Sequence, residues 1–495
     1  MTRRAFKAGV NMASGFGLKV FSPDDLEALH YATLEVLGDV GIKVESNEAL
    51  EIFHGGGAKV EKSEGYGIVK FPPYLIEDCI RWAPSNFVWC GRDPEDDFKA
   101  EPHRVGLTTF GECVQIIDIH TRKIRSSTKK DLANTAKICD YLDEIALVER
   151  PMGSLDQYFK TQPLHNYEAM VTNTGKHIFL GFYSAENTKK LIELAAACVG
   201  GMENFKKRPT VTALVCPSSP LGLVQMCCDV IIECARSGVG VCPISMVLSG
   251  ATAPATLAGS LVTHNAEVLS AIVLAQLTSK GTPCTYASCS TIMDLRFASP
   301  AIGTPEAGIM SAGLTKLAQY YQIPCWVGSG HSDSKLPDAQ SAYESGLSAL
   351  VSALAGANLV YGAGGLESGL TFDYAKLIMD AEQFSRIEHV IKGIDVRDET
   401  IALDVIKEIG PGGEYMTHQH TFENMRSMSR SKLFDRQNRE AWIKNTGGKD
   451  LTERAYEEAL HILENHTPPP LLNGAAETMR SVIEDYENEL KTGRR

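Results

Sequence analysis

The most constraining feature of the sequence is an alternation, between residues 104 and 395, of short apolar runs with longer amphipathic stretches. Short runs rich in β-branched residues predict strands, and apolar residues spaced three and four apart predict helices. The predicted strands are Val105–Phe110, Ala146–Pro151, His177–Phe182, Thr210–Cys216, Val239–Met246, Pro283–Ala287, Cys325–Gly328 and Leu359–Gly362. Eight strands joined by helical crossovers predict an α/β fold, a (β/α)8 TIM barrel.

The stretches between these strands predict the crossover helices. They include Lys129–Leu142, Asn187–Val199, Leu221–Ser237, Leu257–Thr278, Pro305–Tyr321, Ala339–Ala355 and Tyr374–Lys392. A doubly wound open sheet is the alternative, but it normally carries a glycine-rich phosphate-binding turn after its first strand. No G-x-G-x-x-G pattern follows any predicted strand, so the sequence favours the closed barrel over residues 101–395.

The two flanking regions predict additions to the barrel. Residues 1–100 predict a mixed cap that opens with a helix over Ser22–Val40, with Ser22 as its N-cap and Pro23 in its first turn. Residues 396–495 predict a helical extension packed on the barrel. Pro468-Pro469-Pro470 separates a final charged helix from the rest of this extension.

Composition excludes several classes of protein. The formal net charge of −13 argues against a nucleic-acid-binding surface, which needs clustered lysine and arginine. The first residues lack the apolar core of a secretory signal, and no uninterrupted apolar run reaches the roughly 20 residues that span a bilayer. The 13 cysteines lack the spacing of a disulfide scaffold. We therefore expect a cytoplasmic protein without disulfides, membrane segment or nucleic-acid partner.

Candidate catalytic residues follow the predicted strands, because the active site of a TIM barrel is built at the carboxyl ends of its strands. His331 comes directly after Gly328-Ser329-Gly330, which places an imidazole at the mouth of the barrel. Glu306 begins a predicted helix, where a carboxylate is also a favourable partner of the helix dipole. We take His331 and Glu306 as the candidate catalytic residues.

Candidate substrate-binding residues stand in the same loops. Glu112 follows Gly111, and Glu367 lies between Gly365 and Gly369. Each either faces a bound ligand or fixes a turn. Aromatic side chains at or near strand ends are Phe110, Tyr286, Phe297, Trp326, Tyr361 and Phe372. A cage of such rings holds a quaternary ammonium ion through cation–π attraction, although any one of them can equally be a packing residue.

Metal-binding patterns are weak. His418-Gln419-His420 lies beyond the last predicted strand and has no accompanying H-E-x-x-H or paired C-x-x-C pattern. Five cysteines lie in or near successive strands, which keeps a thiol-activating zinc site as an alternative: Cys216, Cys242, Cys284, Cys289 and Cys325. We predict no metal ligand.

Several runs resemble one known family in order along the chain: THNAEVLSAIVLAQLT at 263–278, GTPEAGIMSAGLTKLAQYY at 303–321, SDSKLPDAQ at 332–340 and GANLVYGAGGLESG at 356–369. They resemble the trimethylamine methyltransferase family. The resemblance implies a TIM barrel that delivers a methyl group to the cobalt of a separate, small corrinoid protein. The pyrrolysine of some members would stand directly before the Ser-Asp-x-Lys run, where this sequence has His331.

The missing pyrrolysine bears on the substrate. Members without it include glycine betaine methyltransferases and relatives that act on proline betaine or carnitine, so the resemblance implies a quaternary amine, most closely glycine betaine. On this hypothesis Glu306 and the rings face the ammonium group while His331 binds the carboxylate. The alternatives are a zinc-dependent or other barrel methyltransferase, demethylation of trimethylamine, and a binding subunit without turnover.

The cofactor is expected on a partner. The sequence has no D-x-H-x-x-G run that could supply a lower cobalt ligand, so we expect no tightly bound cofactor and a corrinoid presented by the partner protein. We also expect the chain to form homo-oligomers.

Overall fold

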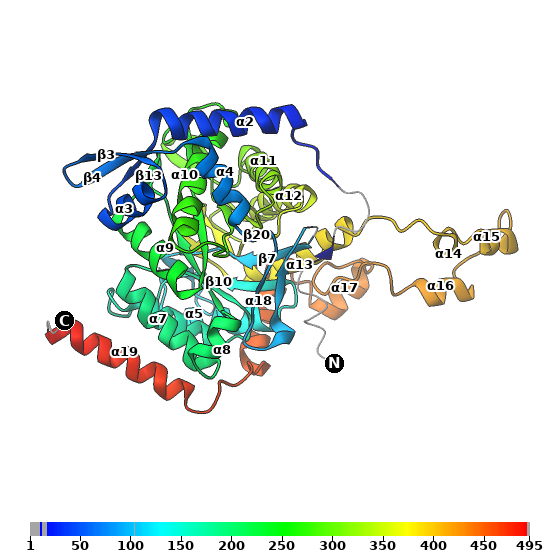
Figure 1. The fold of residues 1–495 in the computed structure, drawn as a ribbon. Helices are drawn as coiled ribbons and strands as arrows, with labels where there is room; N and C mark the ends of the chain where they lie inside the picture. The colour runs from blue at the N-terminus through cyan, green and yellow to red at the C-terminus, as the bar shows by residue number, and fades with distance from the viewer. Residues whose placement is uncertain (1–9, 12–16, 103, 493–495) are drawn as a thin grey trace.

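A closed ring of parallel strands forms the centre of the molecule. The computed structural model describes residues 10–11, 17–102 and 104–492 (Figure 1). The ring consists of β7 (Arg104–Thr109), β10 (Ile145–Glu149), β11 (Ile178–Gly181), β12 (Val211–Val215), β14 (Gly240–Ser245), β16 (Tyr286–Ser288), β19 (Cys325–Gly328) and β20 (Leu359–Ala363). Parallel pairing of β20 with β7 closes it, and the short β1 (Val10–Asn11) pairs antiparallel with β7. The predicted TIM barrel and its eight strands are confirmed.

The crossover helices surround this ring. They are α5 (Lys129–Tyr141), α6 (Gln162–Val171), α7 (Ala185–Cys198), α9 (Gln225–Ser237), α10 (Leu257–Thr278), α11 (Pro305–Tyr320), α12 (Ala339–Ala355) and α13 (Tyr374–Ile391), with the short α8 (Met202–Lys207) after α7. Neither α6 nor the short α8 was predicted. For α6 the reason is its burial. Eight of its ten residues are buried, so it shows no amphipathic pattern, and no side chain caps its start.

The N-terminal region packs along α10, and its last hairpin reaches the amino end of the barrel. It comprises α2 (Pro23–Glu35), a π-helical turn (Val36–Val40), β2 (Ile42–Val44), α3 (Asn47–Gly55), β3 (Lys59–Ser63), β4 (Tyr66–Lys70), α4 (Pro73–Trp82), β5 (Phe87–Trp89) and β6 (Phe98–Ala100). Ser22 caps α2 in a capping box with Asp25, as the sequence predicts. A Cβ at Gly106 would lie 2.7 Å from Phe98, so glycine lets the β5–β6 hairpin close against the strands.

The C-terminal region returns to the barrel after an excursion. Helices α14 (Asp398–Ile401), α15 (Leu403–Ile409) and α16 (Gln419–Asn424) project from the body, as Figure 1 shows. The chain then runs through α17 (Arg439–Thr446) to α18 (Leu451–Asn465), which packs on α13, and to α19 (Ala475–Thr492), which packs on α7. The divisions at residues 100 and 395 stay predictions.

Helix α10 is the longest of the crossover helices, with 22 residues. It is long and apolar enough to span a membrane by length and composition, but 72% of its most apolar window is buried inside the fold. It packs against α2, α4, α9 and α11, so its apolar surface is covered from the cap as well as from the barrel. Its hydrophobicity is therefore accounted for by core packing.

The loops at the carboxyl ends of the strands form two small sheets. One joins β8 (Gln115–Ile117) and β9 (Ile124–Ser126) to β21 (Gly365–Leu366) and β22 (Thr371–Phe372). The other joins β15 (Leu248–Ser249), β17 (Thr291–Asp294) and β18 (Ser299–Ala301). These sheets fix the loops in which the candidate residues stand.

A buried ion pair in α13 supports the loop after β20. Lys376 Nζ lies 2.5 and 2.6 Å from the two carboxylate oxygens of Asp380, and the two side chains are 1% and 9% exposed. Asp380 also accepts a hydrogen bond of 2.9 Å from the Gly364 N–H. Breaking this pair leaves an uncompensated buried charge.

We predict that Lys376→Met lowers the free energy of unfolding by about 3 to 5 kcal/mol, because Asp380 is left buried without its cation. Adding Asp380→Asn should recover most of this loss, since the amide oxygen still accepts from Gly364. Chemical denaturation of both variants measures the effect. A double variant as unstable as Lys376→Met would contradict this account.

Candidate active site

Four of the predicted residues come together at the carboxyl end of the barrel. The rings of Phe110 and Tyr361 stack with centroids 5.0 Å apart, and His331 lies edge-on to Phe110 at 5.7 Å. Trp326 lies 4.4 Å from Tyr361. The four side chains come from three neighbouring strands, β7, β19 and β20, and from the residues that follow them. They form one continuous aromatic cluster.

The sequence analysis missed a pair of charged residues beside this cluster, Glu149 and Arg150, at the end of β10. A Cβ at Gly111 would collide with the Glu149 carboxylate, and the Gly111 N–H donates to the Tyr361 hydroxyl at 3.2 Å. Gly111 therefore contacts both the Glu149 carboxylate and the Tyr361 hydroxyl. A charged pair that ends an otherwise apolar strand is the signal that could have identified both residues.

Glu149 is held in an environment that disfavours its charge. Burial, with the nearby Glu112 carboxylate, raises the pKa of Glu149 well above its ordinary value, while Arg150 opposes the shift. The backbone around it is fixed: the Glu149 N–H donates to Thr108 at 3.1 Å and the Glu149 carbonyl accepts from Thr109 at 2.6 Å. A bound cation would stabilise the ionised form of this carboxyl.

His331 is a neutral imidazole in this setting. It is 2% exposed, and burial lowers its pKa to about 4, with Asp333 opposing the shift and Lys376 adding to it. At neutral pH it therefore offers one N–H donor and one acceptor rather than a positive charge.

Buried polar atoms without a partner gather around the cluster. Among the described residues they include Glu149 Oε2, Arg150 Nε, Trp326 Nε1 and His331 Nδ1. An unsatisfied buried polar atom costs about 1 to 3 kcal/mol, so such atoms are rare and call for an explanation. Four of them at one end of the barrel indicate a site that is completed by a polar ligand.

Three further predicted residues border this site. Glu112 has a positive φ of 71° and forms an ion pair with Arg150. Glu367 accepts a hydrogen bond of 2.5 Å from Thr371, and its N–H donates to the Ser334 carbonyl. Phe372 is buried against Gly364, in the loop after β20. Glu112 and Glu367 thus fix turns, and Glu112 also lies beside the charged pair.

Of the other three predicted residues, Tyr286 and Phe297 lie away from the cluster. Tyr286 donates to Asn265 of α10 at 2.9 Å, so its side chain faces outward from the ring. Phe297 is 75% exposed at the tip of the β17–β18 hairpin and stacks with Arg296. Glu306 lies in the first turn of α11, and no described contact joins it to the aromatic cluster.

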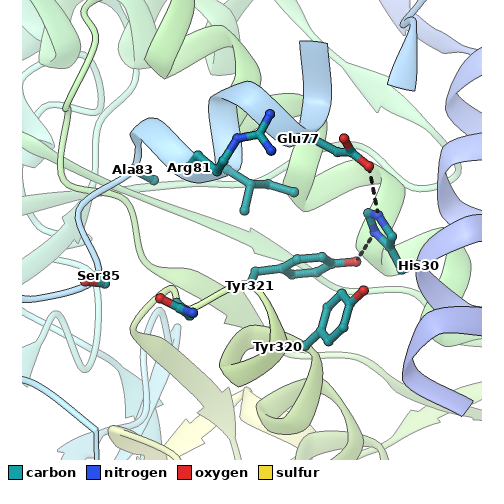
Figure 2. A pocket seen from close by; sticks show the side chains of 9 residues that line it. His30, Glu77, Arg81, Ala83, Ser85, Tyr320 and Tyr321 are labelled. Atoms are coloured by element: carbon teal, nitrogen blue, oxygen red, sulfur yellow. Dashed lines mark hydrogen bonds and ion pairs between the residues drawn. The ribbon is translucent and has the colours of Figure 1, made fainter. Parts of the chain in front are cut away.

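The hydrogen bonds of Tyr286 lead to a pocket near the amino end of the barrel. Asn265 also donates to the Tyr321 hydroxyl at 2.7 Å, and Tyr321 lies 3.1 Å from His30 Nδ1. Figure 2 shows His30 between Tyr321 and Glu77, lining a pocket of about 460 Å³. This pocket contains none of the predicted site residues.

The cysteines and the paired histidines have structural surroundings. Burial raises the pKa of the Cys284 and Cys325 thiols to about 12 and about 11. His418 caps α16 by accepting from the His420 N–H at 3.1 Å. Within the described ranges, no group of three or more histidine, cysteine and acidic side chains is arranged to hold a metal ion.

Comparisons with known proteins identify relatives of the chain and its fold. Residues 10–491 match the family model described as trimethylamine methyltransferase. A trimethylamine methyltransferase of Desulfitobacterium hafniense is 49% identical, with 99% of each chain covered. A glycine betaine methyltransferase of the same species is 31% identical, with 91% of this chain and 94% of the relative covered. The crystal structure of the Methanosarcina barkeri monomethylamine methyltransferase has the same fold, with a TM-score of 0.52 at 13% identity, covering 94% and 93% of the two chains.

The fold is a TIM barrel, the architecture in which enzyme active sites lie at the carboxyl ends of the strands. The sequence matches identify its family. The chain belongs to the trimethylamine methyltransferase family and is a methyltransferase.

We predict that His331 stays neutral throughout the range in which an ordinary histidine titrates, about pH 6.5, because burial holds its pKa near 4. Histidine-labelled NMR spectra, with His331→Gln to assign the signal, measure this directly. A midpoint near the ordinary value would show that burial does not shift the pKa of His331, and would contradict the prediction.

Proposed function

We propose that the protein transfers a methyl group from a quaternary amine, with glycine betaine as first candidate, to the cobalt(I) of a corrinoid on a partner protein. The observation that supports this most is the set of unpartnered buried polar atoms beside the aromatic cluster. A zwitterion would supply partners for both kinds of unpartnered atom. Its methylated cation would lie against the Glu149 carboxylate, and its carboxylate would accept hydrogen bonds from nitrogen donors. Membership of the family supplies the methyl-transfer chemistry.

The cation is assigned to the rings and Glu149. Phe110 and Tyr361 offer π-faces, and each contact with a quaternary ammonium contributes about 0.5 to 2 kcal/mol. Glu149 supplies the countercharge once the cation has stabilised its ionised form. This replaces Glu306 as the proposed partner of the ammonium group, since Glu306 has no described contact with the rings.

The carboxylate of the substrate is assigned to two donors at the carboxyl end of the barrel, Arg150 and His331. Arg150 is fully charged and has an unpartnered Nε, so it can form a charge-assisted hydrogen bond. His331 contributes a neutral N–H donor rather than the charged partner expected from the sequence. Arg150 is thus the primary anchor and His331 a secondary one.

Positioning is the main task of these residues. When a quaternary ammonium loses a methyl group, the electrons of the C–N bond remain on nitrogen and the leaving group is a neutral tertiary amine, so no general acid is needed. The cobalt(I) corrinoid would supply the nucleophile. The chain aligns and desolvates the cation, which is catalysis by orientation.

The rim of the barrel fits the approach of a partner. Apolar side chains are exposed on several strand-end loops, including Phe159, Met246, Phe297 and Leu336. A surface of this kind suits contact with a protein that carries a large, partly apolar macrocycle. Phe297 is accordingly proposed as a docking residue rather than a ring of the cation cage.

Trimethylamine is the second candidate substrate. The 49% identical relative bears that name, whereas the glycine betaine methyltransferase is only 31% identical. Trimethylamine has no carboxylate, so it would leave the Arg150 donor without a ligand partner. The two candidates therefore differ in what they require of Arg150.

We predict that, with a cobalt(I) corrinoid protein supplied, glycine betaine is demethylated faster than proline betaine, carnitine or trimethylamine. Loss of the cobalt(I) absorbance on adding each amine measures the rate, and zinc analysis of the same sample tests the metal-dependent alternative. His331→Ala should lower kcat/KM for glycine betaine. Turnover of trimethylamine alone would select the second candidate, and no turnover with any amine would contradict the proposal.

We predict that Glu149→Gln lowers kcat/KM by about 10- to 100-fold, equivalent to about 1.4 to 2.8 kcal/mol, because the countercharge is lost. Glu306→Gln is the matched control and should leave kcat/KM unchanged. If Glu306→Gln lowers kcat/KM and Glu149→Gln does not, Glu306 is the residue that supplies the countercharge.

The pH dependence provides an independent test of Glu149. Its pKa in the free enzyme is raised and falls when a cation binds, so binding releases a proton and tightens as the pH rises through the free-enzyme pKa. A quaternary amine has no proton of its own to lose. Calorimetry in buffers of different ionisation enthalpy should detect the released proton for the wild type and not for Glu149→Gln.

A further inference from the structure

The segment between α13 and α17 has an unusual surface. From Lys392 to Lys432, which we call the arm, no residue is buried. The arm is anchored at both ends on α13, where Ile391 is buried and Arg386 lies 4.4 Å from the Phe434 ring. Between these anchors, α14, α15 and α16 project away from the body, as Figure 1 shows.

The arm is rich in apolar side chains that contact no core. They include Ile394, Val396, Ile401, Leu403, Ile406, Met416, Phe422, Met425 and Met428; Met416 is 82% and Phe422 69% exposed. Segments that remain disordered are poor in large apolar residues, which this segment is not. Helices are ordered in proteins mainly by packing an apolar face, and in an isolated subunit this arm has nothing to pack against. A covering surface is therefore required.

A matching apolar surface lies on α11 and α12 of the same chain. Tyr343 is 78% and Leu347 54% exposed on α12, and Ile309 is exposed on α11. The two helices touch, since a Cβ at Gly308 would lie 3.5 Å from the Ser348 Cα. We call these three residues the α11–α12 patch.

The composition of α12 also indicates that it is covered. Its only charged residue is Glu344, which accepts hydrogen bonds from the Ser332 hydroxyl and the Asp333 N–H. An outer helix that faces water normally presents a charged or polar stripe. The exposed residues of α12 are Ala339, Gln340, Ala342, Tyr343 and Leu347, among which only Gln340 carries an amide and none carries a charge.

We propose that two copies of this chain associate by exchanging arms, with the arm of each copy lying on the α11–α12 patch of the other. A second copy is favoured because a single chain carries both the arm and a surface for it, so the contact is reciprocal and closes with twofold symmetry. A standard interface needs about 800 Å² and about 20 to 30 residues from each partner, which the length of the arm can supply. The proposal is independent of the methyl-transfer reaction.

The test is the mass of the full chain in solution. Sedimentation velocity and light scattering should give a dimer, or a multiple of it, for the wild type. Met416→Asp/Phe422→Asp in the arm and Tyr343→Asp/Leu347→Asp in the patch should each give monomers with unchanged far-ultraviolet circular dichroism. Met226→Asp on α9, also at an exposed apolar position, is the control and should remain assembled.

Hydrogen exchange locates the contact. Amides of the arm should be protected in the wild type and lose that protection in the patch variant, although the patch variant leaves the arm sequence intact. A monomeric wild type, an assembled arm or patch variant, or an arm protected only after the corrinoid protein is added would each overturn the proposal.

Discussion

The pairing of β20 with β7 is the interaction on which the site depends. Tyr361 is in register with Thr108, so the last strand of the barrel stands beside the first and the Tyr361 ring reaches Phe110. Tyr361 and Gly111, which also form a hydrogen bond, are 250 residues apart in the chain. If the ring of strands were open at this point, neither the stacked rings nor the contact with Gly111 would form. Closure of the barrel and assembly of the site are one event.

The same closure creates an electrostatic problem. Glu149 and Arg150 end a buried strand, and removing such charges from water is expensive unless they are paired. Arg150 has Glu112 as a partner, but Glu149 keeps one oxygen without a hydrogen bond. Because its pKa is raised, Glu149 binds a proton more readily while the site is free, and the protonated carboxyl is neutral and needs no countercharge. A cation that binds beside the carboxyl converts this cost into affinity, which is why a fully buried acid suits the recognition of an ammonium group.

The sequence predicts the barrel well because its signals are local. Helices 257–278 and 339–355 match α10 and α12 at both ends, and every predicted strand lies in the ring. The site is predicted less completely, because it depends on which side of a strand each residue faces. Tyr286-Ala287-Ser288 is buried on both sides, so no alternation indicates that Tyr286 points toward α10. Glu149 lies inside a predicted strand, and only the register of the closed barrel brings it to Gly111.

On the proposed function, the site recognises positive charge on a methylated nitrogen. Glycine betaine and tert-butylacetate have the same shape and the same carboxylate, but carbon replaces the charged nitrogen in the second. Calorimetric titration of the purified protein with both ligands separates charge from shape. We predict that glycine betaine binds at least about tenfold more tightly, equivalent to about 1.4 kcal/mol. Equal affinity for the two ligands would contradict the account.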